Sequence, residues 1–74
     1  MPDQAQPRLS PRQLECLRLA AAGQTSIEIA AELGISSRTV DQHVSEACMR
    51  LRVRNRVQAV AKAVALGLFG QSPL

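Results

Sequence analysis

The chain has 74 residues, which is enough for one small domain and too few for a second. Nine Lys and Arg residues against six Asp and Glu residues give a net charge of +3, and the isoelectric point is about 9.7. This balance favours a polyanion as partner, although many small domains are mildly basic. A single aromatic residue among many Ala, Val, Leu and Ile residues favours closely packed helices over a β-sandwich.

The two ends of the chain are polar or short, and neither resembles a targeting signal. Residues 1–8 and 71–74 are predicted to be flexible tails around a single domain over 9–70. No apolar stretch is long enough to cross a bilayer, so no membrane partner is predicted.

The potential metal ligands and nucleophiles are few. Cys16 and Cys48 each occupy a helical position where Val or Leu would serve, which predicts unbridged thiols in a reducing cytosol. One histidine and no Cys-x-x-Cys pair leave no ligand set for a metal, and no cofactor is predicted. No Ser or Cys nucleophile pairs with His43 by pattern, so the chain is not predicted to be an enzyme.

The first half of the chain predicts two helices. Ser10 followed by Pro11 is a typical helix start, and Gly23 is the expected stop after a helix that runs to about Ala22. Thr25 and Glu28 have the spacing of a capping box, which predicts the start of the next helix. That helix is expected to end in a tight turn at Gly34.

A third helix is predicted over 37–51, with Ser36 as its cap. Its apolar residues recur at helical spacing and so form one face: Val40, Val44, Ala47, Cys48 and Leu51. The opposite face carries Arg38, Asp41, Gln42, Ser45, Met49 and Arg52, with His43 at the flank. A short capped helix, a glycine turn and a longer helix with a polar outer face are the layout of a helix-turn-helix.

A fourth helix is predicted over 56–68, after a cap at Asn55. It is apolar almost all round, and one face can cover the domain core. A second face needs a partner or stands exposed to water, and it comprises Val57, Ala61, Val64 and Leu68.

The polar face of the third helix is the first candidate binding site. In a helix-turn-helix the residues nearest the start of the second helix reach base edges, which predicts base contacts by Arg38, Asp41, Gln42 and Ser45. A glutamine can pair with adenine through two hydrogen bonds, and an aspartate can accept one from the cytosine amino group. The alternative is that this polar face is simply solvated.

A cluster of arginines is the second candidate binding site. Four of them fall within seven residues at the end of the third helix: Arg50, Arg52, Arg54 and Arg56. They suit phosphate contacts, but an ordinary charged helix end, or pairing of one of them with Glu15 or Glu46, would explain them equally. Flanking hydroxyls and His43 complete the predicted phosphate contacts, which are Ser36, Thr39, His43, Arg52, Arg54 and Arg56.

Four segments resemble the DNA-binding domain of LuxR-type (GerE-type) bacterial transcription regulators. They are LSPRQLE (9–15), EIAAELGIS (28–36), RTVDQHV (38–44) and VRNRVQAV (53–60). The resemblance covers about 9–69 and implies an all-α, four-helix helix-turn-helix domain. It implies that the third helix reads DNA, that Asp41, Gln42 and Ser45 touch bases, and that Thr39 with nearby basic residues contacts phosphate. It also implies that the fourth helix supports dimerisation.

The chain departs from the family pattern at two positions. Many relatives have a basic residue where Asp41 stands, so the operator sequence cannot be carried over. The family usually has glycine where Arg52 stands. Most relatives also carry an N-terminal sensing domain, whereas about eight residues precede the domain here. The chain is then either a stand-alone regulator or a fragment, with no small-molecule ligand of its own.

The resulting interpretation is a cytoplasmic, nucleoid-associated bacterial regulator that binds double-stranded DNA as a homodimer. The alternative is a protein-interaction module that docks RNA polymerase or another regulator through the apolar fourth helix.

Overall fold

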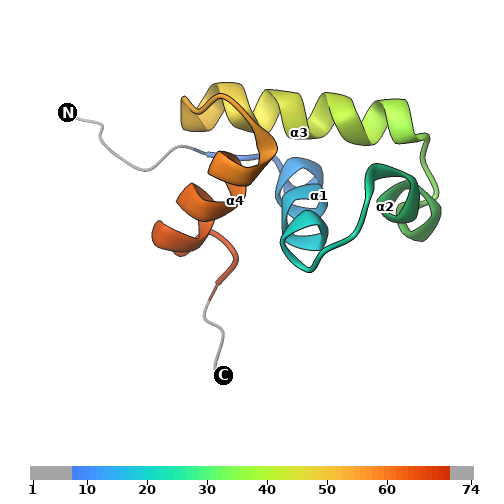
Figure 1. Cartoon of the computed structure of the whole chain (residues 1–74), viewed down its shortest axis with the longest axis horizontal. Helices are drawn as coiled ribbons and strands as arrows, with labels where there is room; N and C mark the ends of the chain where they lie inside the picture. The colour runs from blue at the N-terminus through green and yellow to red at the C-terminus, as the bar shows by residue number, and fades with distance from the viewer. Residues whose placement is uncertain (1–7, 71–74) are drawn as a thin grey trace.

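The computed structural model describes residues 8–70, and over that range the chain forms four α-helices (Figure 1). They are α1 (Pro11–Ala21), α2 (Ser26–Leu33), α3 (Ser37–Leu51) and α4 (Arg56–Ala65). The described residues contain no strand, and the predicted all-α, four-helix class is confirmed. Most of the two predicted tails, 1–7 and 71–74, lies outside the described residues. Arg8, which the sequence assigns to the first tail, accepts a hydrogen bond from Arg50 through its backbone carbonyl.

Every helix begins at a polar residue whose side chain accepts a hydrogen bond from a backbone N–H three residues on. These caps are Ser10, Thr25, Ser36 and Asn55. In α1 and α2 the side-chain oxygen of the third helical residue, Gln13 or Glu28, accepts a hydrogen bond from the backbone N–H of the cap and completes a capping box. Each cap satisfies backbone donors that have no partner inside the helix, which is why these four starts could be predicted from local sequence.

Every helix is followed by a residue with positive φ. Three of these residues are glycines and the fourth is not: Gly23, Gly34, Arg52 and Gly67. After α4, the N–H of Leu68 donates to the carbonyl of Ala63 and the N–H of Gly67 donates to that of Val64. This is the Schellman pattern, in which a left-handed residue closes the helix. The predicted end at Leu68 is therefore wrong, because the turn at Gly67 (φ 70°) ends α4 at Ala65.

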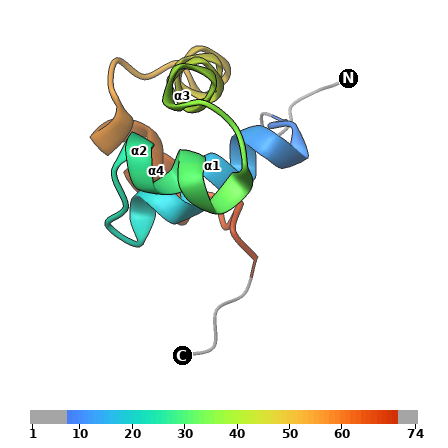
Figure 2. The same ribbon diagram turned by 90° about the vertical axis from the view of Figure 1, so that its right-hand side faces the viewer.

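Helix α3 lies across the other three helices, which pack beneath it (Figures 1 and 2). The first half of α3 joins α1 and α2 in one buried cluster, made of Cys16, Ile29, Ala30, Val40 and Val44. Its second half joins α1 and α4 in another cluster, made of Leu17, Ala47, Leu51, Ala59 and Ala63. Because α3 contributes to both clusters, its inner face is fixed along nearly its whole length.

Polar contacts reinforce the packing on both sides of α3. Gln13 of α1 is buried, and its Nε2 donates to Glu46 Oε1 of α3 at 3.0 Å. The ammonium group of Lys62 in α4 donates to the carbonyl of Leu51 at 2.8 Å. A cation at the C-terminal end of a helix is electrostatically favourable, so Lys62 fixes α4 against the end of α3.

Arg52 occupies the position at which α3 ends. It has φ 60° and ψ 48°, in the left-handed region, and is the one non-glycine residue with positive φ in the described range. The glycine that the family usually has at this position has no Cβ to clash in the left-handed region, whereas Arg52 adopts that conformation with a Cβ and is strained. No side-chain hydrogen bond or ion pair of Arg52 within the described residues offsets this strain.

We expect Arg52→Gly to raise the free energy of unfolding by up to about 1 kcal/mol, because glycine has no Cβ to clash in the left-handed region. The matched control is Arg52→Ala, which removes the same charge but keeps a Cβ and so keeps the strain. Thermal and urea unfolding measure both variants. Equal stability of the glycine and alanine variants would contradict the assignment of strain to Arg52.

Candidate nucleic-acid interface

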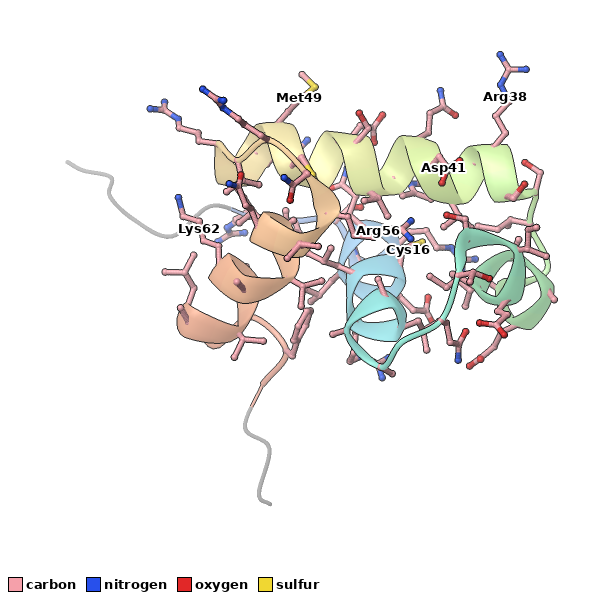
Figure 3. The ribbon with its side chains drawn as sticks, viewed as in Figure 1. Cys16, Arg38, Asp41, Met49, Arg56 and Lys62 are labelled. Carbon is pink, nitrogen blue, oxygen red and sulfur yellow. The ribbon has the colours of Figure 1, made fainter. Side chains whose placement is uncertain are left out.

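The outer face of α3 points away from the rest of the domain. Four residues at helical spacing are exposed on it: Arg38, Gln42, Ser45 and Met49. Figure 3 shows Arg38 and Met49 projecting from α3 on the side opposite to the other helices. We call these four residues the outer face of α3. Its side chains are available to a partner because the packing of the domain uses only the opposite face.

A three-residue connection sets the angle between α2 and α3. Gly34 has φ 71°, and the N–H groups of Gly34 and Ile35 both donate to the carbonyl of Ala30. Ser36 follows at once and caps α3 by accepting from the N–H of Thr39 at 3.0 Å. The tight turn and the immediate cap hold the first turn of α3 clear of α2, as a helix-turn-helix requires.

Three of the four predicted base-contacting residues share this face. Arg38, Gln42 and Ser45 are exposed, and their side chains make no hydrogen bond or ion pair within the described residues. Their donors and acceptors are therefore available to another molecule without breaking an existing contact.

Asp41, the fourth predicted base-contacting residue, has partners on two other helices. Ser26, at the start of α2, donates from its hydroxyl to Asp41 Oδ1 at 2.5 Å. Arg56, at the start of α4, donates from Nη2 to Ser26 Oγ at 2.7 Å and lies 3.7 Å from Asp41 Oδ1. In Figure 3 the Arg56 side chain extends from the start of α4 to just below the part of α3 that carries Asp41. Ser26, Asp41 and Arg56 together form what we call the polar triad.

The predicted phosphate-contacting residues fall into different environments. Ser36 and Thr39 share a hydrogen bond between their hydroxyls at 2.9 Å, at the exposed start of α3. Arg52 and Arg54 are exposed at the other end of α3, and neither side chain has a hydrogen bond or ion pair in the described part of the chain. His43 is half-buried on the flank, and its Nδ1 is buried without a hydrogen-bond partner among the described residues.

The remaining two arginines of the cluster are engaged by the protein itself. Arg50 donates from Nη1 to the carbonyl of Arg8 at 3.0 Å, and Arg56 belongs to the polar triad. Neither they nor Arg52 and Arg54 pair with the two glutamates that the sequence offered. Arg12 pairs with Glu15 at 3.1 Å, and Glu46 accepts from Gln13.

The predicted dimer residues separate into two groups. Val57, Ala61 and Val64 are exposed on α4, with 76% of Val57 and 61% of Val64 accessible to solvent. Leu68 follows the end of α4, is partly buried and packs against the cluster around Leu17. The unpartnered apolar face of α4 therefore consists of Val57, Ala61 and Val64.

Both cysteines are free thiols, with Cys16 fully buried and Cys48 partly buried. Burial raises the pKa of each thiol. The positive charge of Arg12, and more weakly that of Arg56, opposes this shift at Cys16, and Arg56 opposes it at Cys48. Among the described residues no group of three or more His, Cys, Asp or Glu side chains could hold a metal ion. None of the helices in this range is long and apolar enough to cross a membrane.

Two residues of α2 were not predicted from the sequence: Ser26 as a site residue, and Ile27 as an exposed apolar side chain that is 73% accessible. Ser26 directly follows the cap Thr25, and nothing in the local pattern distinguishes it from any other residue of a first helical turn. Its partners lie 15 and 30 residues away, so only the folded arrangement reveals its role.

Four helices, with the second and third joined by a tight turn and the third exposed along a polar face, define a helix-turn-helix DNA-binding fold. Residues 7–63 match the family described as "Bacterial regulatory proteins, luxR family". The chain belongs to this family, and it corresponds to the DNA-binding domain of LuxR-type transcription regulators.

Known proteins and structures agree with this assignment. The chain is 51% identical over 62 residues to the HTH-type quorum sensing-dependent transcriptional regulator RpaR of Rhodopseudomonas palustris, covering 84% of this chain and 26% of RpaR. It is 44% identical over 67 residues to the transcriptional activator protein AhyR of Aeromonas hydrophila, covering 90% of this chain and 26% of AhyR. The chain thus spans about a quarter of the length of these relatives.

Two solved structures share the fold. The structure of the transcription factor GerE matches with a TM-score of 0.76 and 32% identity, covering 80% of this chain and 88% of that chain. SdiA in complex with octanoyl-rac-glycerol matches with a TM-score of 0.84 and 34% identity, covering 96% of this chain and 29% of that chain.

Proposed function

We propose that the chain binds double-stranded DNA sequence-specifically and regulates transcription, with α3 lying in the major groove. The observation that carries this proposal is the outer face of α3, where unengaged polar side chains project from a helix whose inner face is fixed by two core clusters. A B-DNA major groove about 12 Å wide admits one helix. The family membership and the net charge of +3 support the same function, and we propose that the protein acts at the nucleoid in the bacterial cytoplasm.

The side chains available on α3 suit base recognition. Gln42 can form two hydrogen bonds with adenine, Arg38 can form two with guanine, and the Ser45 hydroxyl can pair with several bases. Phosphate contacts surround these positions, and we assign them to Ser36, Thr39, His43, Arg52 and Arg54. Arg56 is engaged in the polar triad, and we assign it no phosphate contact.

We propose that two copies bind together through the apolar face of α4. Val57 and Val64 are strongly exposed there, and a small domain gains stability when a partner covers such side chains. A symmetric dimer with one α3 per subunit would read a roughly palindromic site, with half-sites about one helical turn apart.

The same exposed valines also suit a second function, a protein-interaction module that docks RNA polymerase through α4. Two measurements distinguish the candidates. Selection from a random DNA pool yields a consensus site only for a sequence-specific DNA-binding protein. A mobility-shift titration against salt gives a steep log–log slope only when phosphate contacts release counterions. If selection gives no consensus site and the salt slope is shallow, the docking function is favoured.

Gln42 generates a prediction about base reading. Gln42→Ala should weaken binding to the selected site by roughly 1–3 kcal/mol and relax the preference at one base pair, because a two-bond contact is lost. Stability should barely change, since the side chain is exposed. The measurement compares affinities for the selected site and for random DNA. Equal losses on the two DNAs would contradict the base-reading role.

Arg54 generates a prediction about phosphate contacts. Arg54→Ala should weaken binding to all sequences by a similar factor and lower the salt slope by about one unit, because one counterion fewer is released. The matched control is Arg18→Ala, which removes an exposed arginine from α1, the helix packed against the inner face of α3. A slope that is the same for wild type and Arg54→Ala would place Arg54 away from the DNA.

Val64 generates a prediction about the dimer. Val64→Glu should leave the domain folded, because the residue is exposed, and should lower affinity for a two-half-site operator while sparing a single half-site. Ile27→Glu, at an apolar residue of α2 that is even more exposed than Val64, serves as the control. Sedimentation gives the number of chains per operator, with and without DNA. One chain per two-half-site operator for the wild type would rule out the dimer.

A further inference from the structure

The polar triad joins the starts of α2 and α4 to the second turn of α3, at the edge of the outer face of α3. All of its contacts with Asp41 involve a single carboxylate oxygen, Oδ1, which accepts from Ser26 and lies 3.7 Å from Nη2 of Arg56. Oδ2 has no hydrogen bond or ion pair within the described residues. The Asp41 side chain is 65% exposed, so Oδ2 remains accessible to a molecule that contacts α3.

The polar triad contributes little to the stability of the fold. An ion pair as exposed as Asp41 with Arg56 contributes little to folding, because water screens both charges. Its geometric effect is larger, since a short hydrogen bond from Ser26 and a neighbouring guanidinium restrict the rotation of the Asp41 side chain. Restricting a side chain before binding lowers the entropy that binding must remove.

The triad also changes the electrostatics of a carboxylate near DNA. A lone carboxylate in the major groove is repelled by the phosphates, which carry one negative charge per about 1.7 Å of duplex. The positive charge of Arg56 lies beside Asp41 and offsets that repulsion. The backbone at the start of α4 is fixed, because Asn55 caps the helix and the N–H of Arg54 donates to Gln58, and the Arg56 guanidinium is held by its bond to Ser26.

We propose that Asp41 is a specificity-determining residue that accepts a hydrogen bond through Oδ2 from the amino group of one cytosine in each half-site. Ser26 and Arg56 are its positioning residues: they hold Oδ1 and compensate its charge. Adenine also carries an amino group in the major groove, but its N7 beside that group is an acceptor that repels a carboxylate, whereas cytosine offers the donor alone. This inference rests on the proposed function, because it assigns a base preference to the same DNA-binding helix.

The test measures base preference rather than affinity alone. After selection of a site by the wild-type protein, each base pair is varied in turn and relative affinities are measured by competition for wild type, Asp41→Asn, Asp41→Ala, Ser26→Ala and Arg56→Gln. The wild type should prefer cytosine at one position of each half-site by about tenfold. Both Asp41 variants should abolish that preference. Ser26→Ala and Arg56→Gln should weaken it at the same position and leave the preferences at other positions unchanged.

Two controls separate this role from a general effect of charge or folding. Glu32→Gln removes one negative charge from α2, and Arg12→Gln removes one positive charge from a salt bridge in α1. Neither should change the preference for cytosine. Circular dichroism and thermal melting establish that each variant is folded. Two substitutions of Asp41 are included so that the test remains possible if one of them does not fold.

The outcomes are distinct. A cytosine preference that survives in the Asp41 variants overturns the inference, as does a wild type without such a preference. Uniform losses at all positions for Ser26→Ala and Arg56→Gln would make these residues structural and overturn their positioning role. A wild-type protein that selects no DNA sequence would overturn the proposed function, and this inference with it.

Discussion

The packing of α3 on both sides of its midpoint is the constraint on which the rest of the structure depends. Val40 and Val44 anchor its first half against α1 and α2, whereas Ala47 and Leu51 anchor its second half against α1 and α4. A helix held at both ends of one face cannot tilt or rotate without opening a core cluster. The opposite face is therefore displayed in a fixed orientation, although a domain of this size has a small core.

The contact between α3 and α4 is made by small side chains. Ala47, Ala59 and Ala63 are all fully buried there, which lets the two helix backbones approach closely. The larger residues of α4, Val57 and Val64, consequently lie on its outer side. Proteins usually bury their larger apolar residues, but in α4 the alanines are buried and two valines are exposed. That reversal gives a physical reason for a partner to cover α4.

The sequence predicted the helix starts well and the helix ends less well. Starts depend on a cap and a backbone N–H three residues apart, so their pattern is local. The end of α4 was missed because Gly67 continues the helical spacing of Ala59 and Ala63, and the periodicity concealed a terminating glycine. The polar triad could not be foreseen at all, since its members are brought together only by tertiary packing across three helices. Sequence reasoning did select Asp41 and Arg56, but it assigned them to separate DNA contacts.

Helix α4 connects the outer face of α3 to the surface proposed for dimerisation. Arg56 contacts the triad at the start of α4, and the next residue, Val57, faces outward. Further along, Lys62 is bonded to the end of α3 and Ala63 is buried against it. In the proposed dimer, the contacts between the two α4 helices therefore determine where each α3 lies relative to the other. The separation of the two recognition helices is then set by the packing of short side chains between α3 and α4, rather than by a flexible connection. In the proposed dimer, the tolerated half-site spacing would therefore depend on the packing between α3 and α4.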